Sequence, residues 1–375
     1  MLLVAAGLAP LSNAADLDLT KAVIAHPAKL SGVEEKALVV LREEIEKRTG
    51  IKLSVQTNWP DTATPVIAVG PLVALRGFAG EFAQALGTDS GAAEGYRIRT
   101  GNHGVIVAGN DSRGVLYGVG RLLRNLRMEP GSIRLPDDFS ITTAPAYPLR
   151  GQQLGYRPKT NSYDGWTVPM WDQYIRDLAV FGNNAVELIP PRSDDAADSP
   201  HFPLPQIDMM VEMSRILDEY GMDVWVWYPA MDKDYSDPKT VEFALQEWAE
   251  VFRKLPRIDA VFVPGGDPGH TRPKYLMALL EKQAASLRRY HPKAQMWMSP
   301  QSFSAEWLDE FFEILKGEPD WLAGVVFGPQ VRISLPELRG GMSNSSGRNG
   351  TGRLNSGCTS DSSVSSRIFA SSSPA

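Results

Sequence analysis

The sequence is poor in the residues that build metal sites and disulfides. Its 375 residues include one cysteine and five histidines. A single cysteine excludes an internal disulfide and a cysteine-based zinc site, and the histidines lack the paired spacing of an HExxH motif. No glycine-rich nucleotide-binding motif follows a predicted strand, and no GxSxG nucleophile turn is present. The sequence therefore predicts neither a metal ion nor another cofactor.

The chain also lacks a basic patch and a long apolar run. Its net charge is −6, and its 38 lysines and arginines are dispersed, so nucleic acid is not an expected partner. No apolar stretch approaches the roughly 20 residues that span a bilayer, so a membrane is not an expected partner either. A hydrophobic fraction of 43% and a charged fraction of 22% are typical of a globular protein. The composition does not predict an oligomeric state.

The first 15 residues have the pattern of the end of a secretion signal. Residues 2–11 are apolar, and the small residues Ser12, Asn13 and Ala14 follow, as at a signal peptidase site. The basic segment that opens such a signal is missing, so a frayed tail is the alternative. We expect export to a periplasm or to the exterior.

Residues 18–143 are predicted to form a small α/β domain. Apolar residues recur at helical spacing in three segments, and short apolar runs bounded by turn residues indicate strands between them. The pair Asn110 and Asp111 predicts a helix start. No catalytic constellation is present in this part. The predicted helices are 33–48, 72–86 and 112–126, and the predicted strands are 22–25, 52–56, 65–70, 96–99 and 105–108.

After a proline-punctuated linker at 145–148, residues 147–339 alternate short apolar strands with helices. This alternation predicts a parallel sheet. Polar residues after successive strands favour a (β/α)8 barrel over a doubly wound sheet, but only six of the eight units are present. The predicted strands are 150–156, 185–190, 223–229, 260–263, 295–299 and 322–327, and the predicted helices are 169–181, 206–220, 240–255, 273–290 and 306–316.

Residues 340–375 are rich in serine and glycine and have almost no apolar periodicity. Such a segment cannot bury enough apolar surface to order itself, so a disordered tail is expected. A frameshifted or truncated end and an authentic flexible linker are the two explanations of the tail. With either explanation the predicted fold is a small α/β sandwich domain followed by an incomplete barrel of about six βα units.

Two carboxylates are the predicted catalytic residues. Asp267 lies in the sequence DAVFVPGGDPGH at 259–270, where a buried strand ends in a glycine-rich turn. Barrel enzymes place active-site groups at such strand ends, although Asp267 as a helix cap is the alternative. Glu187 lies inside the strand AVELIP, where alternation directs it to the barrel interior. An interior carboxylate is costly, so Glu187 has either a functional or an ion-paired role.

Aromatic and amide side chains near the strand ends are the predicted sugar contacts. Aromatic rings can stack against sugars, although most such aromatics pack between strands and helices. The amides could bind hydroxyls or brace loops, and the histidine could assist protonation, bind a hydroxyl or lie in solvent. The predicted contacts are Trp227, Tyr228, Trp297, Gln301, Gln330 and His270.

Two regions resemble a known enzyme family. The segments EGYRI at 94–98, VIVAGN at 105–110 and DSRGVLYG at 111–118 resemble the N-terminal domain of family 20 β-hexosaminidases, a domain that family 67 α-glucuronidases share in form. The segment YPLRG at 147–151 resembles the Arg-Gly entry to the catalytic barrel of those families, where the arginine binds sugar hydroxyls. The matching residue here is Arg150.

The resemblance implies an exported glycoside hydrolase-like protein that acts on a hexosaminide or uronide within an oligo- or polysaccharide. Family 20 enzymes have an Asp-Glu pair after the fourth strand, but this chain has GGDP at 265–268, with the single carboxylate Asp267. Glycoside hydrolysis generally needs two carboxyl groups. A truncated, inactive enzyme and a non-catalytic carbohydrate-binding protein are therefore the alternatives.

Overall fold

A computed structural model describes residues 16–326 except 61–62, 80–81, 88–90, 102, 157–163, 194–198 and 269–270. The signal-like segment 1–15 and the tail 340–375 lie outside the described residues. The chain divides at Pro148 into two compact units, and Ala179–Gly182 belong to the first. Within the described residues, no helix has both the length and the apolarity needed to cross a bilayer.

The first unit is an α/β sandwich. Its main sheet has the order β3-β2-β4-β6-β5-β9, in which β5 pairs antiparallel to both neighbours and the other pairs are parallel. A small antiparallel sheet has the order β1-β8-β7. The strands are β1 (Asp16–Asp18), β2 (Val23–Ala25), β3 (Ser54–Gln56), β4 (Val66–Pro71), β5 (Tyr96–Gly101), β6 (Gly104–Gly109), β7 (Arg127–Glu129), β8 (Ser132–Pro136) and β9 (Ser140–Thr143), and the helices are α1 (Gly32–Thr49), α2 (Leu72–Phe78), α3 (Phe82–Ala85) and α4 (Ser112–Leu123).

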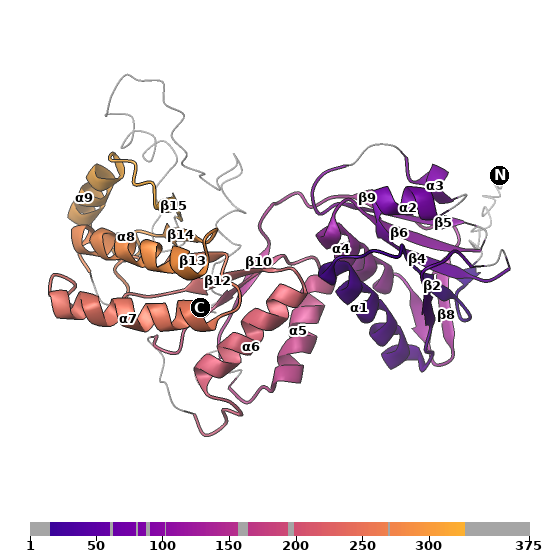
Figure 1. The fold of residues 1–375 in the computed structure, drawn as a ribbon, viewed down its shortest axis with the longest axis horizontal. Coiled ribbons are helices and arrows are strands. Elements are labelled where there is room, and N and C mark those ends of the chain that lie inside the picture. The colour runs from indigo at the N-terminus through magenta and orange to yellow at the C-terminus, as the bar shows by residue number, and fades with distance from the viewer. Residues whose placement is uncertain are drawn as a thin grey trace, which may run out of the picture. The chain divides into compact units, whose positions relative to one another are not determined.

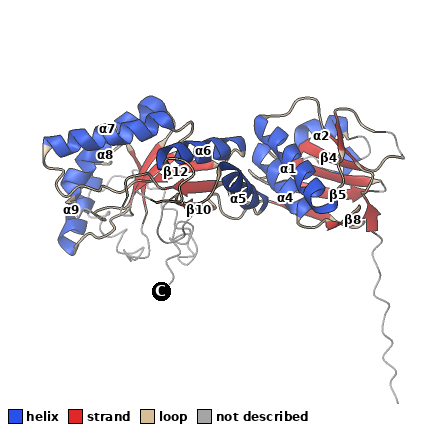
Figure 2. Cartoon of the chain, turned by 90° about the horizontal axis from the view of Figure 1, so that it is seen from below, coloured by secondary structure: helices blue, strands red, loops and turns tan. Residues whose placement is uncertain are grey.

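Helices cover both faces of the main sheet because both faces are apolar. Val66, Ala68 and Ile106 pack with the residues of α2 and α3, and α4 packs over the opposite face, where Gly118 lies against Val107. Helices α1 and α4 lie side by side (Figure 2). The predicted cap is present, since the Gly114 amide donates to Asp111 Oδ1 at 2.8 Å. The single helix predicted at 72–86 is two short helices.

The second unit contains a parallel sheet of six strands in chain order, β10-β11-β12-β13-β14-β15 (Figure 1). Successive strands are neighbours throughout the described sheet, as in a (β/α)8 barrel, and the order does not reverse as it would in a doubly wound sheet. The predicted fold class is confirmed. The strands are β10 (Gly151–Leu154), β11 (Ala185–Leu188), β12 (Asp223–Trp227), β13 (Ala260–Val263), β14 (Gln295–Met298) and β15 (Leu322–Val325), and the helices are α5 (Val168–Val180), α6 (Gln206–Glu219), α7 (Pro238–Lys254), α8 (Pro273–Tyr290) and α9 (Ala305–Leu315).

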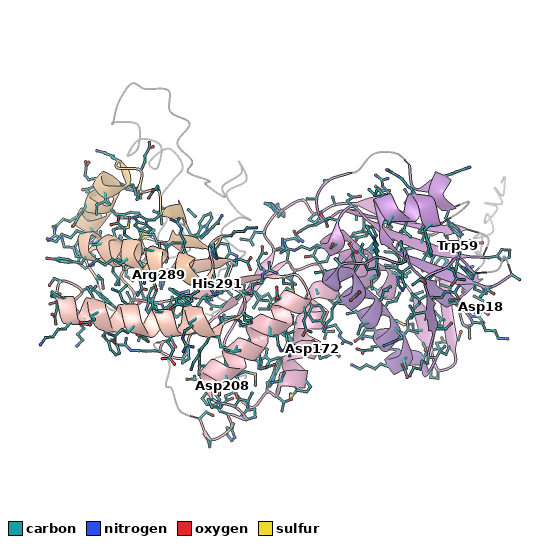
Figure 3. The ribbon with its side chains drawn as sticks, in the orientation of Figure 1. Asp18, Trp59, Asp172, Asp208, Arg289 and His291 are labelled. Carbon is teal, nitrogen blue, oxygen red and sulfur yellow. The ribbon has the colours of Figure 1, made fainter. Side chains whose placement is uncertain are left out.

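The two faces of this sheet differ in composition. One face carries Val186, Val224, Val226, Val261 and further apolar side chains that are completely buried. Helix α6 packs on β12 and α8 packs on β14, so this is the helix-covered face. The other face, called the inner face below, carries the residues that alternate with these valines. Helices α7, α8 and α9 pack in sequence, and His291 at the end of α8 joins two of them (Figure 3). Its Nε2 donates to the Phe252 carbonyl at 2.8 Å.

Candidate active site

The inner face carries a row of side chains that the strand register fixes. Gln153 lies opposite Glu187, which lies opposite Trp225 on the next strand. A second row, nearer the carboxyl ends of the strands, places Trp227, Phe262 and Trp297 beside one another on β12, β13 and β14. Side chains at matching positions of parallel strands point to the same face, so the register gathers these residues on one surface.

Glu187 is the buried carboxyl group of this surface. The residue is 1% exposed. Burial raises the pKa of Glu187 to about 8, because the charged form loses its hydration, and a hydrogen bond from Gln153 acts in the opposite direction. Glu187 is therefore largely a neutral acid near pH 7. Among the described residues this carboxyl group has no cationic partner, so the ion-paired role predicted as the alternative is not seen there.

The two oxygens of Glu187 have different surroundings. Gln153 Nε2 donates to Oε2 at 2.9 Å. Oε1 is buried and has no hydrogen-bond partner among the described residues. Buried polar atoms are normally paired, and an unpaired one is a place where a ligand can supply the missing bond. Gln153 was not predicted from the sequence. Only the register of β10 against β11, which places Gln153 opposite Glu187, identifies it.

Asp267 and Gln301 lie together after β13 and β14. Gln301 Nε2 donates to Asp267 Oδ2 at 2.6 Å, and the Gly266 amide donates to the Gln301 carbonyl at 3.0 Å. Gly265 has φ +64, and a Cβ there would lie 2.4 Å from the Ser299 carbonyl oxygen. Glycine is therefore required for the β13 turn to pack on the β14 turn. This packing presents a partly buried carboxylate beyond the carboxyl end of β13.

Trp297 and Trp227 are partly buried on the inner face. The ring centroids of Trp297 and Trp225 are 5.7 Å apart, and Trp297 Nε1 donates to Gln295 Oε1 at 2.9 Å. The indole of Trp297 also lies over Gly324, where a Cβ would come within 2.3 Å of the ring. Only glycine at position 324 leaves room for the Trp297 ring in this position.

Tyr228 is not on this surface. It is 1% exposed and stacks on Trp248 of α7, with ring centroids 3.9 Å apart and an interplanar angle of 21°. Strand alternation explains the position, because Tyr228 follows Trp227 and so points to the helix-covered face. We correct its predicted sugar contact to a packing role.

Arg150 lies at the opposite edge of the sheet from Asp267. Its amide donates to Asn184 Oδ1 at 2.8 Å, and its carbonyl accepts from the Asn184 amide at 2.8 Å. These bonds place its backbone at the amino end of β10, whereas Asp267 follows the carboxyl end of β13. The structure does not bring the two residues together. His270 and Gln330 lie outside the described residues.

A charged cluster in the loops after β11 and β12 was also not predicted. Arg192 Nη2 lies 2.6 Å from Asp232 Oδ1, and Arg192 Nη1 lies 3.0 Å from Glu247 Oε2. The Tyr235 hydroxyl donates to Asp232 Oδ2 at 3.2 Å. No motif spacing connects these residues in the sequence. The described residues contain no group of three or more His, Cys, Asp or Glu that could hold a metal ion.

Part of the chain matches a known protein family in sequence. Residues 8–142 match the family model described as glycosyl hydrolase family 20, domain 2. The predicted resemblance is confirmed. No curated protein matches the chain in sequence. The match covers the first unit, which carries none of the candidate catalytic residues.

Solved glycoside hydrolases resemble most of the chain in fold. A family 20 β-N-acetylhexosaminidase from Streptomyces coelicolor A3(2) matches with a TM-score of 0.60 and 14% identity, over 88% of this chain and 70% of that one. A mutant β-hexosaminidase from Streptomyces plicatus, in complex with the product GlcNAc, matches with a TM-score of 0.58 and 13% identity, over 86% and 75%.

A family 115 4-O-methyl-α-glucuronidase with specificity for decorated arabinogalactans matches with a TM-score of 0.59 and 14% identity, over 86% of this chain and 48% of that one. The glucuronidase in this comparison is thus from family 115, whereas the sequence resemblance pointed to family 67. At these identities the three likenesses establish the fold and leave the chemistry to be argued from the residues of this chain.

Proposed function

We propose that the second unit hydrolyses an O-glycosidic bond in an oligo- or polysaccharide that contains a hexosaminide or a uronide. Glu187 is the general acid in this proposal, and Asp267 is the second carboxyl group. The observation that supports the proposal most is the buried, neutral Glu187 on the inner face, since glycoside hydrolysis needs a carboxylic acid that holds a proton near pH 7.

The proposed reaction transfers the proton of Glu187 to the glycosidic oxygen as the bond from that oxygen to the anomeric carbon breaks. The oxygen leaves as a hydroxyl, water adds its OH to the anomeric carbon, and the proton that the water releases restores the Glu187 acid. Asp267 acts as the carboxylate on the reacting sugar, and Gln301 holds it in place by the 2.6 Å hydrogen bond. Glu187 has the role of acid in this proposal because it is the desolvated carboxyl group of the two.

The sugar contacts in this proposal are Trp227 and Trp297. Both rings are partly exposed on the surface that carries Glu187, whereas Tyr228 is enclosed by α7. An aromatic ring with one open face can stack on the C–H face of a sugar and keep its other face packed. The partial exposure of these two indoles therefore favours a saccharide as the ligand.

The test is hydrolysis of a panel of chromogenic glycosides that includes an N-acetylglucosaminide and a glucuronide. We expect the protein to hydrolyse at least one of them, and Glu187→Gln and Asp267→Asn each to lower kcat/KM by about 10²- to 10⁴-fold. Glu281→Gln, on the exposed side of α8, is the matched control and keeps full activity. An inert protein, or full activity in Glu187→Gln, contradicts the proposal.

A carbohydrate-binding protein without catalysis is the second candidate. The turn GGDP at 265–268 offers one carboxylate, and Gln301 already donates to it. Calorimetric titration with the same glycosides separates the two candidates. Binding that depends on Trp297 but is never followed by product release favours the binding protein.

A further inference from the structure

We infer that Gln153 is a positioning residue that directs the proton of Glu187 to Oε1 and so toward the ligand. This inference rests on the proposed function of Glu187 as an acid. Its basis is the geometry of the two facing strands β10 and β11. Gln153 and Glu187 are register partners, and Gln153 Nε2 reaches Glu187 Oε2 at 2.9 Å.

The hydrogen-bonding capacities of Gln153 and Glu187 indicate which oxygen of Glu187 carries the proton. An amide N–H can only donate, so the oxygen that it contacts must accept. In a neutral carboxyl group one oxygen is a carbonyl and the other carries the proton. The carbonyl oxygen is the stronger acceptor of the two, so the bond from Gln153 favours the form in which Oε2 is the carbonyl oxygen and Oε1 carries the proton.

The proton on Glu187 Oε1 has no acceptor among the described residues. Oε1 is buried, and a ligand that reaches it on the inner face would supply the missing acceptor. A glycosidic oxygen is such an acceptor. With the amide absent, the carboxyl group could rotate and place its proton on either oxygen. Gln153 removes that freedom before the ligand arrives, and this preorganisation is what a proton donor requires.

Within the part of the chain that the structure describes, no charged group acts on this carboxyl, and its pKa responds to burial and to Gln153. The two neighbouring strands supply one ionisable side chain, Asp223 of β12, and its carboxylate is bound to Arg257 at 3.2 Å at the amino edge. Removal of the Gln153 amide therefore acts on Glu187 without a competing change in nearby charge.

The experiment titrates the carbonyl stretching band of the Glu187 acid by infrared difference spectroscopy. The band is identified by its loss in Glu187→Gln. In Gln153→Met we expect the band to move to higher frequency, because the carbonyl loses its donor. We also expect the pKa of Glu187 to rise by about one unit, since a hydrogen bond to a charged group changes an equilibrium about tenfold or more.

The control is Gln152→Met, which removes the same side chain from the next position of β10, where the residue is exposed. It leaves the band and the pKa unchanged. Gln153→Asn, whose amide is one methylene too short, gives the same direction of shift as Gln153→Met and serves if the latter does not fold. An unmoved band, or a pKa that falls, overturns the inference, because a fall means that the amide oxygen accepts the Glu187 proton.

Activity supplies a separate measurement. In Gln153→Met we expect kcat to fall at least tenfold with little change in KM, and the alkaline limb of the pH–rate profile to move to higher pH. An unchanged kcat and limb would overturn the inference although the wild-type protein is active. If the wild-type protein hydrolyses no glycoside, the proposed function fails, and the infrared titration alone decides whether Gln153 directs the proton.

Discussion

The amino and carboxyl edges of the second unit's sheet differ in how their polar groups are satisfied. At the amino edge, Arg257 lies among three carboxylates that precede or begin β12 and β13. It binds Asp259 through two nitrogens at 2.7 and 3.1 Å, Asp223 at 3.2 Å and Asp218 at 3.1 Å. Asp259 also accepts from the Val224 amide at 2.8 Å. Each of these side chains therefore forms at least one hydrogen bond or ion pair.

At the carboxyl side of the same sheet, buried polar atoms remain without partners. Glu187 Oε1, Ser299 Oγ and Thr271 Oγ1 are buried and form no hydrogen bond within the described residues. Each lies in the carboxyl half of a strand or in a segment that follows a strand. Unsatisfied buried polar groups cost free energy, so these three atoms carry a cost to stability that a ligand can offset.

The pairing of polar groups indicates a different role for each edge of the sheet. The amino edge resists unfolding, because its charges are paired before any ligand binds. The carboxyl edge also has paired groups, in the Arg192 cluster and at Asp267, but it is the edge at which buried atoms of Glu187, Ser299 and Thr271 have no partner among the described residues. This division agrees with barrel enzymes in general, in which the carboxyl edge is catalytic and the amino edge contributes stability.

The largest expected effect concerns the pH dependence of stability. The folded pKa of Glu187 is about 8, above its ordinary value of 4.5, so the folded state binds a proton that the unfolded state releases. Stability is therefore greatest below pH 4.5 for this group and falls as pH rises to about 8, by a few kcal/mol in the unfolding free energy. Urea unfolding at several pH values measures it.

Glu187→Gln is the comparison for that titration. Glutamine stays neutral, so the difference in unfolding free energy between the two proteins should grow from pH 5 to pH 8 in favour of the variant. The difference cancels the contributions of other titrating groups, such as His291, whose pKa burial lowers. A difference that is constant with pH would show that Glu187 is ionised in the folded protein.

The next largest effect is at the amino edge. Arg257→Ala leaves three carboxylates facing one another without a cation, and we expect a loss of about 2 kcal/mol in unfolding free energy. Arg289→Ala, on the exposed end of α8 (Figure 3), is the control and changes stability by less than about 0.5 kcal/mol. Equal effects of the two substitutions would remove the contrast between the edges.

Much of this sheet could be predicted from the sequence, because short apolar strands alternate with amphipathic helices at regular spacing. The strand at 260–263 and the helix at 273–290 have the predicted bounds. The short strands β1, β7 and β9 were missed, because three or four mostly exposed residues give no clear alternation, and the five-residue strand β8 was missed although Ile133 and Leu135 alternate in it.

The candidate site could be predicted less completely. Glu187 and Asp267 stand out because each is a carboxylate beside an apolar run. Gln153 and Arg192 do not, since their partners Glu187 and Asp232 are 34 and 40 residues away in the chain. Tyr228 was misassigned because one residue of alternation decides whether an aromatic meets a helix or the inner face.

Substitutions of Trp297 and Tyr228 test whether only the aromatic on the inner face affects the KM for the glycoside. Trp297→Phe reduces the ring that faces the ligand, and we expect KM for the best glycoside to rise about fivefold, near 1 kcal/mol. Tyr228→Phe keeps the stack on Trp248 and should leave KM unchanged. Steady-state kinetics of both variants measures the difference, and a KM effect of Tyr228→Phe would return that residue to the site.

The smallest effect, and the most direct test of the two edges, is a pair of identical substitutions at buried serines. Ser214 Oγ donates to the Arg257 carbonyl at 2.8 Å and accepts from the Arg257 amide at 3.1 Å, whereas Ser299 Oγ has no partner among the described residues. Ser214→Ala should therefore lower the unfolding free energy by about 1 kcal/mol, and Ser299→Ala should leave it unchanged or raise it slightly. Thermal unfolding of both variants without ligand gives the comparison. A loss in Ser299→Ala as large as that in Ser214→Ala would mean that the Ser299 hydroxyl is already satisfied, and the carboxyl edge would then be less open to a ligand than its unpaired atoms indicate.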